Sequence, residues 1–189
     1  MSVRLSAGSI PPAGPHLTVP FTIIVDTREQ IPYSFTGFEA DHEDAKRYRP
    51  KNMTIKAATG LPLYVPTATD TLLTGDYSVR GMAALATIER KSLADLYGSL
   101  GAGRDRFERE HERMSHMVFA AVVIDAGWQE IFSNPPPQSK LSPKSVHRTM
   151  CSWQQRYGVS WLAMGDRRLA EITTFRILEK FWREENGVS

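Results

Sequence analysis

The stretch from Gly75 to Lys91, GDYSVRGMAALATIERK, constrains the fold more strongly than any other part of the chain. Its apolar run Leu85–Ile88 is typical of a strand, and Asp76–Val79 has the composition of a strand entry. Between these two runs, Arg80 and Gly81 mark the position of a turn. The stretch therefore predicts an antiparallel β-hairpin whose two ends lie close together.

Side chains on the second strand of this hairpin should alternate between its two faces. Glu89 and Lys91 are therefore expected to share one face, while Arg90 points to the other. Asp76 enters the first strand at the same end of the hairpin. We expect Asp76, Glu89 and Lys91 to converge on one small volume.

Two carboxylates in one small volume repel each other, and a bound divalent cation neutralises both. Oxygen ligands suit Mg²⁺ or Mn²⁺, and a lysine beside such an ion can stabilise the charge that develops on a phosphate. This combination is typical of metal-assisted phosphodiester hydrolysis. The alternative is a hairpin with an ordinary surface ion pair between Glu89 and Lys91, because charged residues are common at strand ends.

The residues in and around the hairpin also form a longer motif. The run Asp76-Tyr77 … Glu89-Arg90-Lys91-Ser92-Leu93-Ala94-Asp95 resembles the GD…ERKxxxD signature of the XPF-type structure-specific nucleases. Further matches flank this run: Val25-Asp26-Thr27-Arg28-Glu29 upstream, then Asp95-Leu96, Ser99-Leu100 and Gly103-Arg104 downstream. The resemblance implies a restriction-endonuclease-like core, catalysis with a divalent metal, and cleavage of branched or flapped DNA.

The same resemblance gives expected roles to individual residues. Three carboxylates would face Mg²⁺ or Mn²⁺, one lysine would stabilise the transition state, three arginines would position phosphate, and one glutamate would support the site. The carboxylates are Asp26, Asp76 and Glu89, and the lysine is Lys91. The arginines are Arg28, Arg90 and Arg104, and the supporting glutamate is Glu29. For Asp26–Glu29, the alternative is a turn-forming aspartate followed by a surface Arg–Glu pair.

Composition narrows the classes of function. The chain has 189 residues, of which 41% are hydrophobic and 23% charged, as is ordinary for a globular protein with one substantial core. A net charge of only +2 gives no gross basic excess, so any DNA-binding surface must come from local clusters. The lone Cys151 excludes an internal disulfide and a cysteine-based zinc site, and its apolar helical context predicts a buried side chain.

The sequence contains no sign of a membrane segment. No apolar run approaches the roughly 20 residues that a membrane-spanning helix needs, and the N-terminus lacks the apolar core of a signal peptide. A cytoplasmic protein, in a bacterial cell or a virus-infected host cell, is therefore expected. Its expected partner is DNA, with a homodimer or a partner protein supplying further DNA-binding surface.

The organisation of the chain predicts a single nuclease domain over residues 21–185, preceded by a flexible arm over the proline-rich residues 1–20. Residues 39–70 are expected to be an irregular insertion or loop, either substrate-contacting or solvated and without a role. Within it, the charged run Glu39–Arg49 is compatible with a short exposed helix that ends at Pro50. The short stretch after Trp182 leaves no room for the helix-hairpin-helix pair or the helicase module of relatives. The resemblance therefore implies a stand-alone domain of bacterial or viral type.

Beyond the hairpin, capping signals place the next elements. Ser92, followed three residues later by Asp95, predicts a helix start and gives Asp95 a structural rather than a catalytic explanation. Ser142 followed by Pro143 predicts another helix start. The apolar run Phe119–Ile124 predicts a central strand that is covered on both faces. This alternation of strands and helices predicts an α/β fold, an α/β/α sandwich with a central mixed β-sheet.

A highly charged helix is expected from about Arg104 to Met117. Its inward-facing side chains should be Phe107, Met114 and Val118, which recur at roughly helical spacing. His111 is expected on the solvent-facing side of this helix rather than at a metal, because no partner at ligand spacing is visible.

Three functions remain open from the sequence. The first is a metal-dependent DNA endonuclease that acts on branched, flapped or junction DNA. The second is a non-catalytic DNA- or partner-binding module with the same fold, and the third is a nuclease that cuts plain duplex DNA. The presence of Asp76, Glu89 and Lys91 together favours an enzyme over a non-catalytic module.

Overall fold

The computed structural model describes residues 10–188. The chain divides into two compact units, Met1–Thr71 and Leu72–Ser189. Of the flexible arm expected over residues 1–20, residues 1–9 lie outside the described part.

The first unit contains two small groups of strands and two short helices. Strands β2 and β5 pair in parallel, so that Asp26 at the end of β2 lies opposite Asp70 at the end of β5. A separate three-stranded sheet has the order β1-β4-β3. The elements are β1 (Leu17–Thr18), β2 (Ile23–Asp26), β3 (Phe38–Glu39), α1 (His42–Tyr48), α2 (Ile55–Ala58), β4 (Pro62–Tyr64) and β5 (Thr67–Asp70).

Two expectations about this unit need correction. Leu17 and Val19 are almost fully buried and β1 pairs with β4, so the end of the expected flexible arm is an ordered part of the unit. Residues 39–70 contain α1, α2, β4 and β5 rather than an irregular insertion. Each of these elements has only three to seven residues, too few to produce a clear hydrophobic period, and capping by Asp41 and Thr54 starts the two helices.

The second unit is a mixed sheet flanked by helices. The strand order is β6-β7-β8-β9, in which β6 is antiparallel to β7 and the other pairs are parallel. The elements are β6 (Tyr77–Val79), β7 (Ala86–Lys91), α3 (Leu93–Leu100), α4 (Arg104–Met114), β8 (Phe119–Ile124), α5 (Trp128–Ser133), α6 (Pro143–Tyr157), β9 (Ser160–Ala163) and α7 (Arg167–Glu185). The predicted hairpin and α/β class with a mixed sheet are confirmed.

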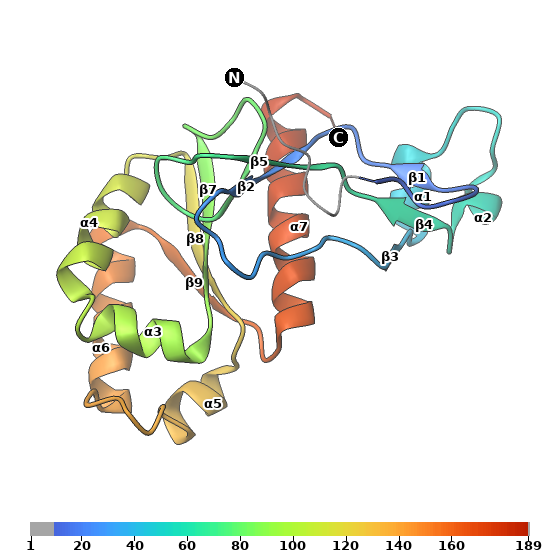
Figure 1. The fold of residues 1–189 in the computed structure, drawn as a ribbon. Coiled ribbons are helices and arrows are strands. Elements are labelled where there is room, and N and C mark those ends of the chain that lie inside the picture. The colour runs from blue at the N-terminus through green and yellow to red at the C-terminus, as the bar shows by residue number, and fades with distance from the viewer. Residues whose placement is uncertain (1–9, 189) are drawn as a thin grey trace. The chain divides into compact units, whose positions relative to one another are not determined.

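The helices of this unit form two layers around the sheet. Helix α7 contacts β6, β7 and β8, whereas α3 contacts β7 and α6 contacts β9 from the opposite side (Figure 1). The core between the sheet and α3–α6 includes Val122, Ile124 and Trp153, all of which are buried. Among the described residues, no helix is both long enough and apolar enough to cross a bilayer.

The predicted helix starts are confirmed, but some side chains lie elsewhere than expected. Ser92 caps α3 and Ser142 caps α6 through hydrogen bonds from backbone N–H groups. Val118 is 68% exposed rather than inward-facing, because α4 ends at Met114 and Val118 belongs to the connection before β8. Cys151 is exposed, contrary to the prediction, because the buried stripe of α6 passes through its neighbour Met150.

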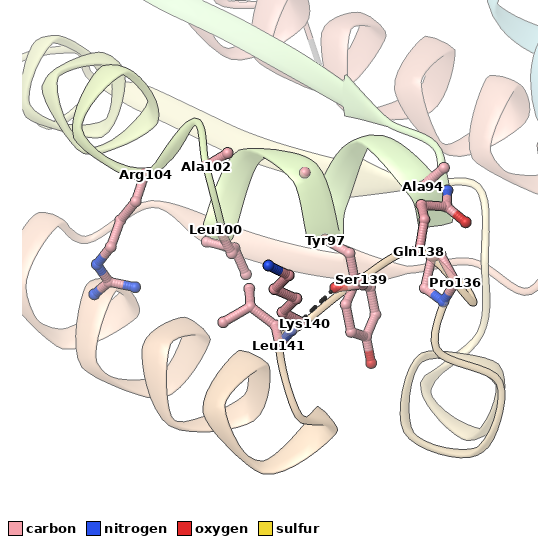
Figure 2. A pocket seen from close by; sticks show the side chains of 12 residues that line it. Ala94, Tyr97, Leu100, Ala102, Arg104, Pro136, Gln138, Ser139, Lys140 and Leu141 are labelled. Atoms are coloured by element: carbon pink, nitrogen blue, oxygen red, sulfur yellow. Dashed lines mark hydrogen bonds between the residues drawn. The ribbon is translucent and has the colours of Figure 1, made fainter.

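A pocket of about 690 Å³ opens beside α3. Its walls are α3, the turn from α3 into α4, and the loop that precedes α6 (Figure 2). All of these segments belong to the second unit.

Gly75 is needed at the entrance to the hairpin for two reasons. Its φ angle of +76° lies in the left-handed region that favours glycine. A Cβ atom at this position would also lie 2.0 Å from the hydroxyl oxygen of Thr87. That hydroxyl is fixed, because it donates a hydrogen bond of 2.9 Å to the carbonyl oxygen of Thr74.

We predict that Gly75→Ala lowers the free energy of unfolding by about 3 kcal/mol or more, through backbone strain and a clash with Thr87. Gly81→Ala is the matched control, because Gly81 also has a positive φ of +82° but a Cβ there meets no atom within 4 Å. It should cost only about 1 kcal/mol. Urea denaturation of both variants measures the difference, and equal losses would contradict the proposed contact.

Candidate functional site

Glu89 and Lys91 form an ion pair near the end of β7. The ammonium group of Lys91 donates a hydrogen bond to the carboxylate of Glu89, and the two side chains are only 13% and 6% exposed, for Lys91 and Glu89 respectively. The ammonium nitrogen also lies 4.7 Å from the ring centroid of Phe107 on α4. Glu89 and Lys91 therefore share one face of the strand, as the alternation predicted, in a buried rather than a surface ion pair.

Asp76 is held against the same end of β7 by backbone hydrogen bonds. Its own N–H donates to the carbonyl oxygen of Ile88 over 2.8 Å, and its carboxylate accepts from the N–H of Arg90 over 2.7 Å. These contacts fix a carboxylate close enough to Glu89 for the two charges to repel each other. The hairpin thus brings Asp76, Glu89 and Lys91 together, as predicted.

Glu110 is a third acidic side chain at this site, and the sequence analysis missed it. Its carboxylate accepts hydrogen bonds from the hydroxyl of Thr74 at 3.3 Å and from the N–H of Gly75 at 3.4 Å. A signal for it existed in the sequence. Glu110 lies three residues after the inward-facing Phe107, and residues at this spacing share a helix face.

The electrostatics of the site show an excess of negative charge. Burial raises the pKa of Glu89 well above its usual value, and repulsion from Asp76 and Glu110 adds to this effect, while Lys91 opposes it. Burial lowers the pKa of Lys91, but the carboxylates of Glu89, Asp76 and Glu110 outweigh it, so the pKa of Lys91 is raised. One ammonium group therefore faces three acidic side chains.

This donor set suits a hard divalent cation. Carboxylate oxygens are preferred ligands of Mg²⁺ and Mn²⁺, and a cation beside Asp76 and Glu89 would remove the repulsion that raises the pKa of Glu89. Within residues 10–188, no group of three or more His, Cys, Asp or Glu side chains is arranged to hold a metal ion, so the fit rests on the chemistry of the Asp76 and Glu89 carboxylates and not on a complete set of ligands.

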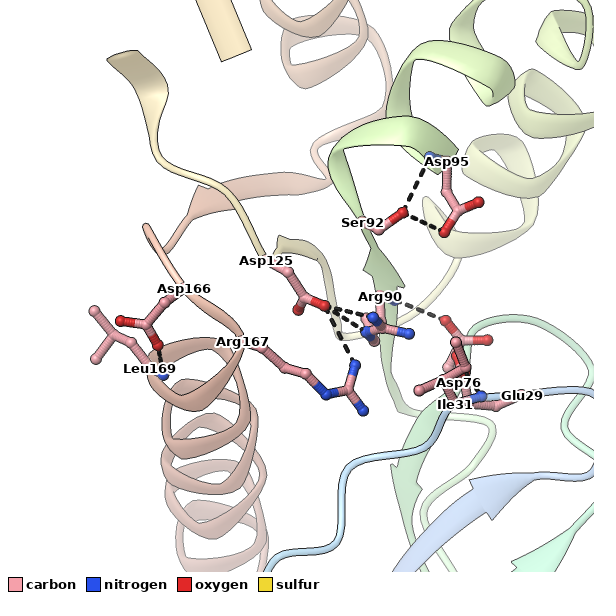
Figure 3. A network of polar contacts seen from close by, with 10 residues as sticks. All are labelled: Glu29, Ile31, Asp76, Arg90, Ser92, Asp95, Asp125, Asp166, Arg167 and Leu169. Atoms are coloured by element: carbon pink, nitrogen blue, oxygen red, sulfur yellow. Dashed lines mark hydrogen bonds and ion pairs between the residues drawn. The ribbon is translucent and has the colours of Figure 1, made fainter. Parts of the chain in front are cut away.

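Arg90 points away from Glu89 and Lys91 and pairs with another carboxylate. Its guanidinium group donates to Asp125, directly after β8, with an Nε–Oδ2 distance of 2.8 Å, and its side chain is 9% exposed. Arg167 at the start of α7 contacts the same oxygen at 3.3 Å (Figure 3). This arrangement favours a role for Arg90 in holding the ends of β7 and β8 together.

In the first unit, Asp26 is bound by Arg28. The guanidinium group of Arg28 donates to both carboxylate oxygens of Asp26, at 2.7 and 3.0 Å, and the backbone N–H of Arg28 donates at 2.8 Å. Asp26 is 2% exposed, whereas the Arg28 side chain is 64% exposed. Glu29 accepts a hydrogen bond from the N–H of Ile31. Their roles at a metal remain predictions from the resemblance.

Arg104 begins α4 and lies against α6. Its guanidinium group donates to the hydroxyl of Thr149 at 3.0 Å and stacks 5.1 Å from the ring centroid of Trp153. It also lines the pocket beside α3. Its contacts are separate from the ion pair of Glu89 and Lys91, although both lie in the second unit.

His111 is fully buried, so its expected position on the solvent-facing side of α4 is wrong. Its Nδ1–H donates to the carbonyl oxygen of Phe107 at 3.0 Å, and its ring stacks on Trp161 with a centroid distance of 4.9 Å. Burial lowers the pKa of His111 to about 4, and Lys91 also lowers it, while the hydrogen bond to Phe107 and the charges of Glu110 and Glu108 oppose the shift.

We predict that His111 destabilises the fold in acid. The unfolded chain takes up a proton on this imidazole near pH 6.5, whereas the folded chain does so only near pH 4. Stability should therefore fall as the pH drops through this window, by about 3 kcal/mol in total from this one group. His111→Phe keeps an aromatic ring but cannot take up a proton. It should therefore remove the part of the acid-induced loss of stability that His111 causes, as measured by urea unfolding from pH 7 to pH 4.

A second prediction concerns the repulsion around Glu89. Asp76→Asn keeps an acceptor for the N–H of Arg90 but removes one negative charge, so we expect it to raise the free energy of unfolding by about 1 kcal/mol in excess EDTA at pH 8. Glu112→Gln, an exposed change on α4, is the control and should shift it by less than about 0.5 kcal/mol. Destabilisation by Asp76→Asn would show that its charge is not repelled at this site.

Comparison with known proteins places these residues in a family. The chain is similar to XPF from Aeropyrum pernix (17% identity, TM-score 0.53) and to a structure of XPF from Aeropyrum pernix in complex with DNA (18%, 0.54). Both alignments cover 87% of this chain but only 65% and 66% of those chains, slightly less than two thirds of their length. Curated protein sequences give no match. The ERCC4 domain model matches residues 25–173, well over half of the chain, and the protein therefore belongs to the ERCC4 domain family.

Proposed function

We propose that the protein is a divalent-metal-dependent DNA endonuclease that cuts branched, flapped or junction DNA. The observation that carries this proposal is the buried ion pair of Glu89 and Lys91 with Asp76 beside it. A buried cluster with more acids than bases is costly unless a cation joins it. Its residues are also the GD and ERK elements of the motif, within the family match.

Asp76 and Glu89 would hold a Mg²⁺ or Mn²⁺ ion. The resemblance alone assigns Asp26 to the metal ligands and Glu29 to a supporting role. When bound, such an ion polarises a phosphoryl oxygen and lowers the pKa of water. Lys91 stays protonated at neutral pH because its pKa is raised. Its ammonium group is therefore a permanent positive charge beside the carboxylates, suited to stabilise the charge that develops on the scissile phosphate.

Arg28 and Arg104 would position the phosphate backbone, as the resemblance implies. The guanidinium group of Arg28 is well exposed, and Arg104 is held by Thr149 and Trp153 at the start of α4. Arg90 would act through Asp125 by fixing the strand end that carries Glu89 and Lys91. Because the family match spans residues 25–173, we assign both units to one nuclease domain.

DNA is the proposed partner, and one solved relative of similar fold is a complex with DNA. A net charge of +2 supports only a few phosphate contacts per chain. We therefore propose that a second copy or a partner protein adds DNA-binding surface. We propose that it acts in the cytoplasm of a bacterial cell or of a virus-infected host cell.

The test is cleavage of labelled splayed-arm, 3′-flap, four-way-junction, single-stranded and duplex DNA with Mg²⁺ or Mn²⁺. We expect cuts near the branch points with either ion and none in excess EDTA. Cleavage that persists in EDTA would overturn the metal mechanism. Equal cutting of continuous duplex would point to a nuclease for plain duplex DNA. If the protein binds DNA but cuts none of these substrates, it is a non-catalytic binding module.

Lys91 and Arg90 should respond differently in this assay. Lys91→Met keeps an apolar stem against Phe107 but removes the ammonium group, so the single-turnover rate at saturating DNA should fall by about 10²–10³-fold. Lys180→Met, on the exposed face of α7, is the matched control and should keep the wild-type rate. Arg90→Ala should lower the melting temperature because it leaves Asp125 without its nearest partner. If Arg90→Ala is stable but inactive while Lys91→Met is fully active, Arg90 and not Lys91 is the cation that stabilises the scissile phosphate.

A further inference from the structure

The pocket beside α3 has the size of a ligand site and mainly apolar walls. Its volume of about 690 Å³ lies within the range of small-molecule pockets. Leu100 and Tyr97 of α3 face Pro136 and Leu141 of the opposite loop (Figure 2). The hydroxyl of Tyr97 is already occupied, since it donates to the carbonyl oxygen of Ile131 at 2.6 Å, so Tyr97 offers the pocket its ring.

Gly98 keeps this pocket open. It lies inside α3, where glycine destabilises a helix by about 1 kcal/mol relative to alanine. Neither its φ angle nor a close neighbour requires glycine, because a Cβ atom there would meet no atom within 4 Å. The space beside Gly98 is part of the pocket. The absence of a side chain at this position therefore leaves room for a ligand.

The charges at the pocket suit an anionic ligand. Arg104 and Lys140 are the charged residues that line it, and both are cationic. Figure 2 shows Arg104 toward one end, Gln138 toward the other, and Lys140 between them. Thr149 and Trp153 hold the Arg104 side chain in place. Lys140 is exposed, and it takes part in none of the ion pairs of the described residues.

Helix α4 connects this pocket with the candidate active site. Arg104 begins the helix, Phe107 lies under the Lys91 ammonium group, and Glu110 reaches the Thr74–Gly75 turn. At 1.5 Å per residue, the six positions from Arg104 to Glu110 span about 9 Å along the helix axis. Stacked nucleotides rise about 3.4 Å each, so this separation corresponds to two or three nucleotides.

We propose that the pocket binds one unpaired nucleotide of the DNA strand, a few positions from the phosphate that is cut. The base would enter between the apolar walls, and Arg104 and Lys140 would bind the flanking phosphates. A base paired within a continuous duplex enters only at the additional cost of its pairing and stacking energy, about a few kcal/mol. The pocket thereby selects DNA with a single-stranded segment. This inference rests on the proposed nuclease function for its biological role, but the binding itself can be tested without cleavage.

The test compares wild type, Gly98→Leu and Gly98→Ala in excess EDTA. A leucine side chain at this lining position narrows the pocket, whereas the alanine methyl group meets no atom within 4 Å. Both residues favour a helix more than glycine does. Binding of a fluorescent single-stranded oligonucleotide and of a blunt duplex of the same sequence is measured by anisotropy. We expect Gly98→Leu to bind the single strand about tenfold more weakly than wild type, with unchanged duplex affinity and an undiminished melting temperature. Gly98→Ala should bind like wild type.

Lys140→Gln provides an independent variant at the same pocket. Loss of one phosphate contact to a single strand should reduce the slope of log affinity against log salt by about 0.7.

An oligonucleotide that contains 2-aminopurine should change its fluorescence on binding to wild type and not on binding to Gly98→Leu. Wild-type single-strand affinity in Gly98→Leu, or no single-strand binding by the wild type, would overturn the proposal.

Binding and cleavage separate the two proposals. If the wild type shows the predicted pattern of binding but cuts no DNA, the nucleotide pocket stands and the nuclease function is wrong. If the wild type cuts branched DNA and Gly98→Leu binds and cuts like wild type, the nuclease function stands and the pocket proposal is wrong.

Discussion

The buried ion pair of Glu89 and Lys91 is the interaction on which the rest of the second unit depends. A charged pair this far from solvent is tolerated only when neighbouring groups hold its geometry. Asp76 is fixed by the backbone of β7, Phe107 supports the ammonium group, and Arg90 and Asp125 join the ends of β7 and β8. The mixed sheet thus carries a small cluster of opposing charges, and the contacts of β7, β8 and α4 hold this cluster in place.

The sequence predicted those parts of this cluster that depend on local geometry. Strand alternation correctly separated Lys91 from Arg90, and the turn near Gly81 correctly brought Asp76 to Glu89. Glu110 and the burial of His111 depend instead on how α4 packs against the sheet and α6. The charged pattern of α4 resembles that of a solvated helix, and only tertiary packing determines which of its polar residues are enclosed.

The first unit shows a different limit of sequence reasoning. Its helices and strands are so short that hydrophobic periodicity gives no signal over most of residues 39–70. The charged run Glu39–Arg49 was compatible with a short helix, and α1 lies within it, but α2 was missed because the cap of Thr54 does not define a helix without an apolar stripe. The buried Leu17 and Val19 were hidden in the same way among prolines and small residues.

The hairpin that carries the acidic cluster also has a consequence for folding order. Strands β6 and β7 are neighbours in sequence and pair after closure of a short loop, whereas β7 and β8 are parallel and need the α3–α4 crossover to meet. Local pairings form faster than distant ones, because less chain entropy is lost before the contact is made. We therefore expect Asp76, Glu89 and Lys91 to come together early and in contact with solvent, and the docking of α4 to enclose them only when the crossover is complete.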